Sequence, residues 1–245
     1  ASGGIRDGVA RQAVHVGAQT SVELVVPRLI ETPGEVTADL HVHTGLSGDS
    51  FLGDSRRFLS LVAADVDVVA ITDHNRIRDP RPALEMLDLD DAIETIPGVE
   101  FRFGSSGNSI GHGNAFPLNP GGRAIRPGAA PPAEVMANWR RHHETNPIAD
   151  SKAPLLIQLN HPRGIQFNVD KRHRMDGHAL FNELSYNPRL PMEDHSDVRV
   201  RAIDVESGAT ALDFDVLEIL NRFSLEAWRL VRADWFAMMN RGRFP

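Results

Sequence analysis

Apolar and polar residues follow one another along most of the chain in the order of a short strand, a loop and a helix. The pattern predicts strands at 38–43, 66–72, 92–101, 110–116, 155–160 and 216–221, and helices at 55–64, 133–144 and 225–240. Residues 66–72 are almost continuously apolar, which is typical of a strand buried on both faces. Strands that alternate with helices predict an α/β sheet or barrel.

The first 35 residues stand apart from this pattern. Ser21–Val26 alternates partly between polar and apolar residues and is stopped by Pro27, which predicts one strand. Pro33 and Gly34 then mark a break. We expect residues 1–35 to be the last strand of an upstream β domain and a linker, and residues 36–245 to form the main domain. The alternative is that 1–35 contributes the first strand of the main domain.

Composition and charge narrow the classes of function. The chain has 245 residues, 33 acidic and 26 Lys and Arg side chains, and a net charge of −7. This length allows a sizeable core, and the acidic balance lacks the electrostatic footprint of a nucleic-acid or anionic-membrane binder. No apolar run approaches the roughly 20 residues that span a bilayer. The lack of Cys excludes thiolate ligands and Cys nucleophiles but leaves the compartment open.

The 11 histidines carry most of the information about chemistry. His41 and His43 lie in the predicted strand at 38–43, where alternation places both side chains on one face. Two imidazoles at positions i and i+2 can bind one metal ion. The alternative for this pair is two polar histidines that are satisfied by hydrogen bonds.

Four further polar clusters lie at or just after predicted strands. Thr72–His74 and Asn160–Pro162 directly follow apolar strands, at the end where α/β barrels build active sites. Gly98–Glu100 places a carboxylate in an apolar strand, where it needs a cation or a hydrogen-bond partner. Gly111–Gly113 adds another histidine. Together these clusters predict a site of nitrogen and oxygen ligands, which suits divalent metals.

In this order of motifs, residues 36–245 resemble the polymerase-and-histidinol-phosphatase (PHP) superfamily of metallohydrolases, and most closely its carbaryl-hydrolase-like branch. The resemblance implies an α/β fold, a distorted (β/α)7 TIM-like barrel, with two or three divalent ions at its mouth. The identity of the ions stays open, because this ligand set accepts Zn, Mn or Fe. The metal ligands that it implies are His41, His43, Asp49, His74, Glu100, His112 and His161.

The resemblance also implies how the ligands are shared between ions. His41 and His43 would hold the first ion, and Glu100 would bridge the first and the second. His112 and His161 would complete the second site. A third ion would take the remaining two ligands, one histidine and one carboxylate.

That third ion would be bound by His74 and by Asp49. Asp49 lies one residue later than the carboxylate of the family's usual Ser-Asp-Gly form. We expect Asp73 to orient a ligand or a water as part of the catalytic site. Arg163 follows His161 by two residues, and its planar fork suits a phosphate or a carboxylate; the alternative for Arg163 is a salt bridge.

One departure from the family concerns the end of the chain. The family closes its site with an Asp-x-His motif after a final strand, and this chain ends at Pro245, where that strand would begin. We therefore expect the barrel to lack its final strand here and the first and third metal sites to be incomplete. Asp176–His178 has the right letters but lies in a polar loop, and His142 and His143 are expected on a solvated helix face.

The resemblance thus implies a metal-dependent hydrolase of small molecules that uses a metal-bridged hydroxide, with phosphoesters as the favoured substrates. Carbamate, ester or amide hydrolysis on the same ions is the first alternative. A second is the amidohydrolase class, which also begins with His-x-His but needs a metal-bridging Lys or carboxylate in mid-barrel. A third is a non-catalytic metal- or ligand-binding module of a larger protein. The oligomeric state stays open.

Overall fold

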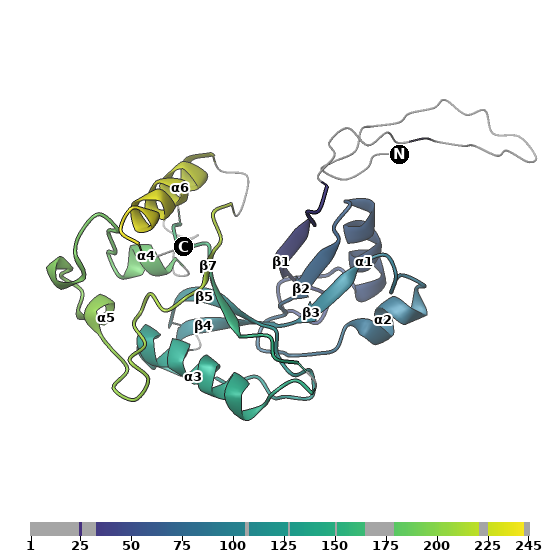
Figure 1. Ribbon diagram of the computed structural model, residues 1–245, viewed down its shortest axis with the longest axis horizontal. Coiled ribbons are helices and arrows are strands. Elements are labelled where there is room, and N and C mark those ends of the chain that lie inside the picture. The colour runs from purple at the N-terminus through teal and green to yellow at the C-terminus, as the bar shows by residue number, and fades with distance from the viewer. Residues whose placement is uncertain are drawn as a thin grey trace, which may run out of the picture. The chain divides into compact units, whose positions relative to one another are not determined.

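The computed structural model describes residue 25 and residues 33–105, 108–126, 128–149, 151–164, 179–220 and 225–242 (Figure 1). The chain divides into two compact units. The first unit ends at Asp73 and resumes over Asp79–Ile96, and the second contains His74–Arg78 and the chain from Pro97 onward. Each unit holds one small sheet, of three strands in the first and four strands in the second.

The first unit alternates strands and helices, as the sequence pattern predicts, although its second helix was not among the predicted elements. Its elements are β1 (Ala38–Val42), α1 (Asp54–Ala63), β2 (Val68–Ile71), α2 (Arg81–Met86) and β3 (Glu94–Pro97). Strands β1 and β2 are parallel neighbours, with α1 as the crossover between them. Its core contains Val42, Phe58, Leu61, Val69, Ile71, Leu84 and Ile93.

The second unit is built around the sheet β4-β5-β6-β7. Its elements are β4 (Val99–Ser105), β5 (Asn108–Phe116), α3 (Pro132–Thr145), β6 (Leu156–Asn160), α4 (Leu180–Glu183), the 3-10 helix η1 (Met192–Asp194), α5 (Val198–Arg201), β7 (Val216–Leu217) and α6 (Leu225–Met239). Strand β5 is antiparallel to both β4 and β6, and β7 runs parallel to β6. After α6, Gly242 has a φ of 66°, a conformation that favours glycine just past the end of a helix.

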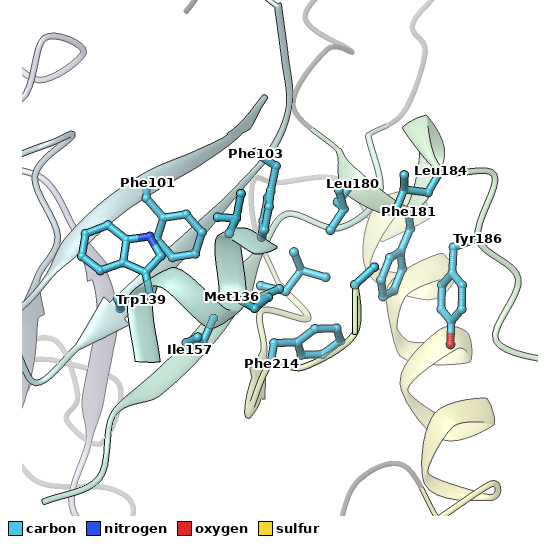
Figure 2. Close-up of a cluster of buried hydrophobic side chains, with 14 of the residues drawn as sticks. Phe101, Phe103, Met136, Trp139, Ile157, Leu180, Phe181, Leu184, Tyr186 and Phe214 are labelled. Atoms are coloured by element: carbon cyan, nitrogen blue, oxygen red, sulfur yellow. The ribbon is translucent and has the colours of Figure 1, made fainter. Parts of the chain in front are cut away.

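This four-stranded sheet has one apolar and one polar face. Phe101 and Ile157 belong to the apolar face and pack in one buried cluster with Met136 and Trp139 of α3 (Figure 2). Because side chains alternate along a strand, the residues between these apolar positions share the opposite face. That face carries Glu100, Arg102, His112, Asn114, Gln158 and Asn160.

The prediction of a (β/α)7 barrel is wrong. Such a barrel needs parallel strands, each followed by a helix, whereas the described residues form two small sheets and no closed barrel. The chain is interrupted at Gly98, so that the single strand expected at 92–101 becomes β3 and β4. Strand β4 then pairs directly with β5 as an antiparallel hairpin, without a helix between them. Because the described residues form no barrel, the expectation that its final strand is missing no longer applies.

Some expectations fall on residues outside the described ranges. The strand at Ser21–Val26, of which only residue 25 is described, and the Asp176–His178 loop are among them. The boundary between residues 35 and 36 stays a prediction. Within the described part of the chain, none of the helices combines the length and apolar character that crossing a bilayer requires.

Candidate metal centre

The candidate centre lies on the polar face of the second unit's sheet, around the carboxylate of Glu100. This residue is in β4 and is only 1% exposed. Its Oε2 lies 3.2 Å from Nε2 of His74, and its Oε1 lies 3.2 Å from Nδ1 of His112 and 3.6 Å from Nε2 of His161. Three imidazoles that are far apart in the sequence therefore converge on one buried carboxylate.

Backbone pairing brings the first two of these histidines to Glu100. His74 forms an isolated parallel bridge with Glu100, and the next residue, Asn75, donates its N–H to the Glu100 carbonyl at 3.1 Å. His112 lies on β5, one alternate position from Asn114, which is directly opposite Glu100. The main chain thus fixes both histidines relative to the carboxylate before any side-chain contact is made.

The glycines on either side of His112 explain how closely strand β5 approaches the core. A Cβ at Gly111 would lie 2.8 Å from Cβ of Leu180, and a Cβ at Gly113 would lie 2.7 Å from Cζ of Phe101. Real side chains would clash at both positions. The Gly-His-Gly pattern therefore lets β5 lie against the core with one face while the imidazole projects from the other.

The fourth residue, His161, is held by its backbone. It directly follows β6 and has a φ of 29°, a left-handed conformation that is strained for a residue with a Cβ, by about 1–3 kcal/mol. Its N–H donates to Oε2 of Glu218 at 2.7 Å. Glu218 follows β7, and its own N–H donates to the Leu159 carbonyl of β6 at 3.0 Å. This exchange stabilises the turn that presents the imidazole.

The side chains of the cluster form a compact donor set. The rings of His74 and His112 meet edge to face at a centroid distance of 5.2 Å, as do those of His112 and His161. One ligand atom each of His74, Glu100 and His112 lies within 4.8 Å of the others. Imidazole nitrogens with a carboxylate oxygen are a ligand set that Zn, Mn and Fe accept. The group can hold one divalent ion, and the identity and number of ions remain predictions.

An amide network behind the carboxylate sets its orientation. Nδ2 of Asn160 donates to Oε1 of Glu100 at 2.9 Å and to Oδ1 of Asn114 at 2.8 Å, while Oδ1 of Asn160 accepts from Nε2 of Gln158 at 3.0 Å. All four side chains are buried. No role for Asn160 was predicted, although polar residues at alternate positions of an otherwise apolar strand were a signal for one.

The first unit brings together His41, His43 and Asp49. The two imidazoles are 5.1 Å apart between ring centroids. Nδ1 of His43 lies 2.9 Å from Oδ1 of Asp49, which also accepts from Oγ of Ser47 at 2.6 Å. Asp49 therefore reaches His43 although its position in the sequence is shifted by one from the family form.

Asp73 belongs to the first unit and is fully buried. Its carboxylate accepts from the N–H of Thr44 at 2.6 Å and from Oγ1 of Thr44 at 2.8 Å. Thr44 directly follows His43, so Asp73 fixes the end of the strand that carries the two histidines. These contacts support a positioning role for Asp73.

Arg163 has structural contacts. Its Nε donates to Oδ2 of Asp234 in α6 at 2.7 Å, a second nitrogen donates to the Tyr186 carbonyl at 2.6 Å, and the guanidinium lies over the Phe181 ring. This arrangement favours the salt-bridge alternative for Arg163. A role in catalysis stays a prediction without support from these contacts.

The helix face at His142 and His143, expected to be solvated, is only partly exposed. Both side chains are half-buried. The His142 ring lies edge to face against Trp139 at 5.5 Å, and Nε2 of His143 lies 3.2 Å from the Ala153 carbonyl oxygen. The two histidines are therefore in contact with the second unit and only partly exposed.

Comparison with known proteins finds no matching family model and no matching curated protein. The resemblance to the PHP metallohydrolases therefore stays a prediction. The structural evidence on function is the cluster of His74, Glu100, His112 and His161.

Proposed function

We propose that the chain is a metal-dependent hydrolase whose ion is bound by His74, Glu100 and His112, with His161 as a fourth ligand. The observation that carries the proposal is the buried carboxylate with three imidazoles within 3.6 Å. An ionised carboxylate at 1% exposure needs a compensating positive charge. One protonated histidine would supply it, but convergence of three imidazoles is what a cation site requires.

The residues around this cluster have separable tasks. Glu100 supplies the negative charge, and Asn160 holds its carboxylate in one orientation. Glu218 stabilises the strained backbone that presents His161. A bound divalent ion lowers the pKa of a coordinated water and stabilises the negative charge that develops on the substrate oxygens.

Phosphoesters are the substrates that we propose, in line with the resemblance of the sequence. Hydrolysis breaks the bond between phosphorus and the ester oxygen, joins the oxygen of one water to phosphorus, and returns a proton to the leaving alcohol. The first unit offers ligands for a second ion in His41, His43 and Asp49. This is supported by the distance of 2.9 Å between Nδ1 of His43 and Oδ1 of Asp49.

The experiment is metal analysis combined with turnover. Protein purified without chelator is analysed by mass spectrometry for Zn, Mn and Fe, and assayed with p-nitrophenyl phosphate and p-nitrophenyl acetate. Glu100→Gln is compared with Glu144→Gln, the same chemical change at an exposed position of α3. We expect at least one equivalent of metal and phosphatase activity in the wild type and in Glu144→Gln, and loss of both in Glu100→Gln.

Other outcomes separate the alternatives. Metal binding without turnover of either ester would favour a non-catalytic binding module. Turnover of the acetate alone would favour the ester- and carbamate-cleaving class. A wild-type chain that binds no metal, even after Zn or Mn is added back, would overturn the proposal.

A further inference from the structure

Arg102 lies on the strand that carries Glu100, beside the candidate metal centre, and is not one of its proposed ligands. It is two residues after Glu100 in β4, so both side chains project from the polar face of the sheet. In the register of the sheet, Arg102 is directly opposite His112 of β5. Residues opposite each other on antiparallel strands have Cβ atoms about 4.5–5.5 Å apart. The arginine is thus the immediate cross-strand neighbour of a proposed metal ligand.

One nitrogen of the Arg102 guanidinium, Nε, is buried and has no acceptor within the part of the chain that the structure describes. Three other arginines of the second unit are paired, Arg140 with Asp213, Arg163 with Asp234, and Arg199 with Asp197. A buried donor without an acceptor costs about 1–3 kcal/mol, and more when the group is charged.

The neighbouring acidic side chain does not fill this role. Glu100 directs its two oxygens to Asn160 and to the surrounding imidazoles. On the polar face the other side chains opposite β4 and along β6 are the uncharged Asn114, Gln158 and Asn160. A negatively charged acceptor for Arg102 would therefore come from outside the residues that the structure describes.

We propose that Arg102 forms an anion-binding position next to the metal centre, where it would bind charged oxygens of the phosphate ester proposed as substrate. This inference rests on the proposed function. The planar fork of a guanidinium matches two oxygens of a phosphate, and such charge-assisted pairs are stronger than neutral hydrogen bonds. A phosphate ester has oxygens for the ion and further charged oxygens for Arg102. A neutral carboxylic ester or carbamate has no anionic oxygen for this position and gains nothing from it.

The test measures binding of inorganic phosphate to the Zn- or Mn-loaded chain by isothermal titration calorimetry. Arg102→Gln is expected to raise the phosphate Kd about 10- to 100-fold, because a charge-assisted hydrogen bond is lost. Arg102→Lys keeps the charge without the fork and should fall between the two. Arg123→Gln, the matched change at an exposed arginine of the same unit, should leave the Kd unchanged.

Two further measurements make the result decisive. Metal content and the unfolding midpoint of each variant show whether the metal centre and the fold persist. If Arg102→Gln does not fold, the phosphate Kd of Arg102→Lys is compared with that of the wild type instead. Equal phosphate Kd values for the wild type and Arg102→Gln, with metal retained, would overturn the inference and leave the metal site standing. The inference would likewise be overturned if Arg102→Gln slowed the hydrolysis of p-nitrophenyl acetate but left the phosphate Kd unchanged. Absence of metal from the wild type would instead count against the proposed function.

Discussion

Replacing Glu100 by Gln removes one negative charge with almost no change in shape. The carboxylate is 1% exposed and contacts His74, His112 and Asn160. At an effective dielectric constant of about 20, two unit charges about 4 Å apart interact by about 4 kcal/mol. This corresponds to about a thousandfold in the Kd of an ion. A divalent ion in direct contact would lose more, so we expect the metal Kd to rise at least a thousandfold.

The assay is thermal unfolding with and without Zn or Mn. A ligand at 100 times its Kd stabilises the folded chain by about 2.7 kcal/mol. We expect the midpoint of the wild type and of Glu144→Gln to rise on metal addition, and that of Glu100→Gln to stay where it was. If Glu100 serves only to balance an imidazolium, the variant loses stability to the same extent with and without metal. Equal metal-induced stabilisation of the wild type and Glu100→Gln would refute the ligand assignment.

Three further changes test other parts of the structure. Asn160→Ala removes the donor that orients Glu100 and should raise the metal Kd about 10- to 100-fold, measured by competition with a chelator dye. Gly113→Ala places a Cβ 2.7 Å from Phe101 and should lower the free energy of unfolding by about 1–3 kcal/mol in urea, whereas Gly48→Ala, which meets no atom within 4 Å, should change it little. Burial, with repulsion from a neighbouring histidine, lowers the pKa of His142. The unfolded chain therefore binds this proton more tightly, and the stability present above about pH 6.5 is lost as the pH falls through the folded pKa; His142→Gln should reduce the loss between pH 8 and pH 5.

The local elements were largely predictable from the sequence. Apolar periodicity located β1, α1, α3 and α6 to within one or two residues. The prediction of these elements succeeds because burial of one face of a helix or strand requires apolar residues at a fixed spacing in the sequence. The resemblance placed His74, Glu100 and His112 in one multi-metal site, but it paired His74 with Asp49 on a third ion, whereas the structure places His74 beside Glu100 and His112.

The architecture was not predictable in the same way. Periodicity locates a strand but carries no information on the direction of its neighbours. The break at Gly98 and the hairpin of β4 with β5 decide against a barrel, and both depend on pairing between strands. The contacts of Asn160 and the position of Arg102 opposite His112 were missed for the same reason, because each depends on which residue lies opposite on the next strand.

The most direct test of the metal centre is X-ray absorption spectroscopy of the chain with one equivalent of Zn. The double variant His41→Ala/His43→Ala removes the two histidines of the first unit and leaves His74, Glu100, His112 and His161. We predict a shell of nitrogen and oxygen at about 2.0–2.1 Å with the outer-shell scattering of two or three imidazoles. A shell of oxygen alone, without imidazole scattering, would contradict the proposed centre.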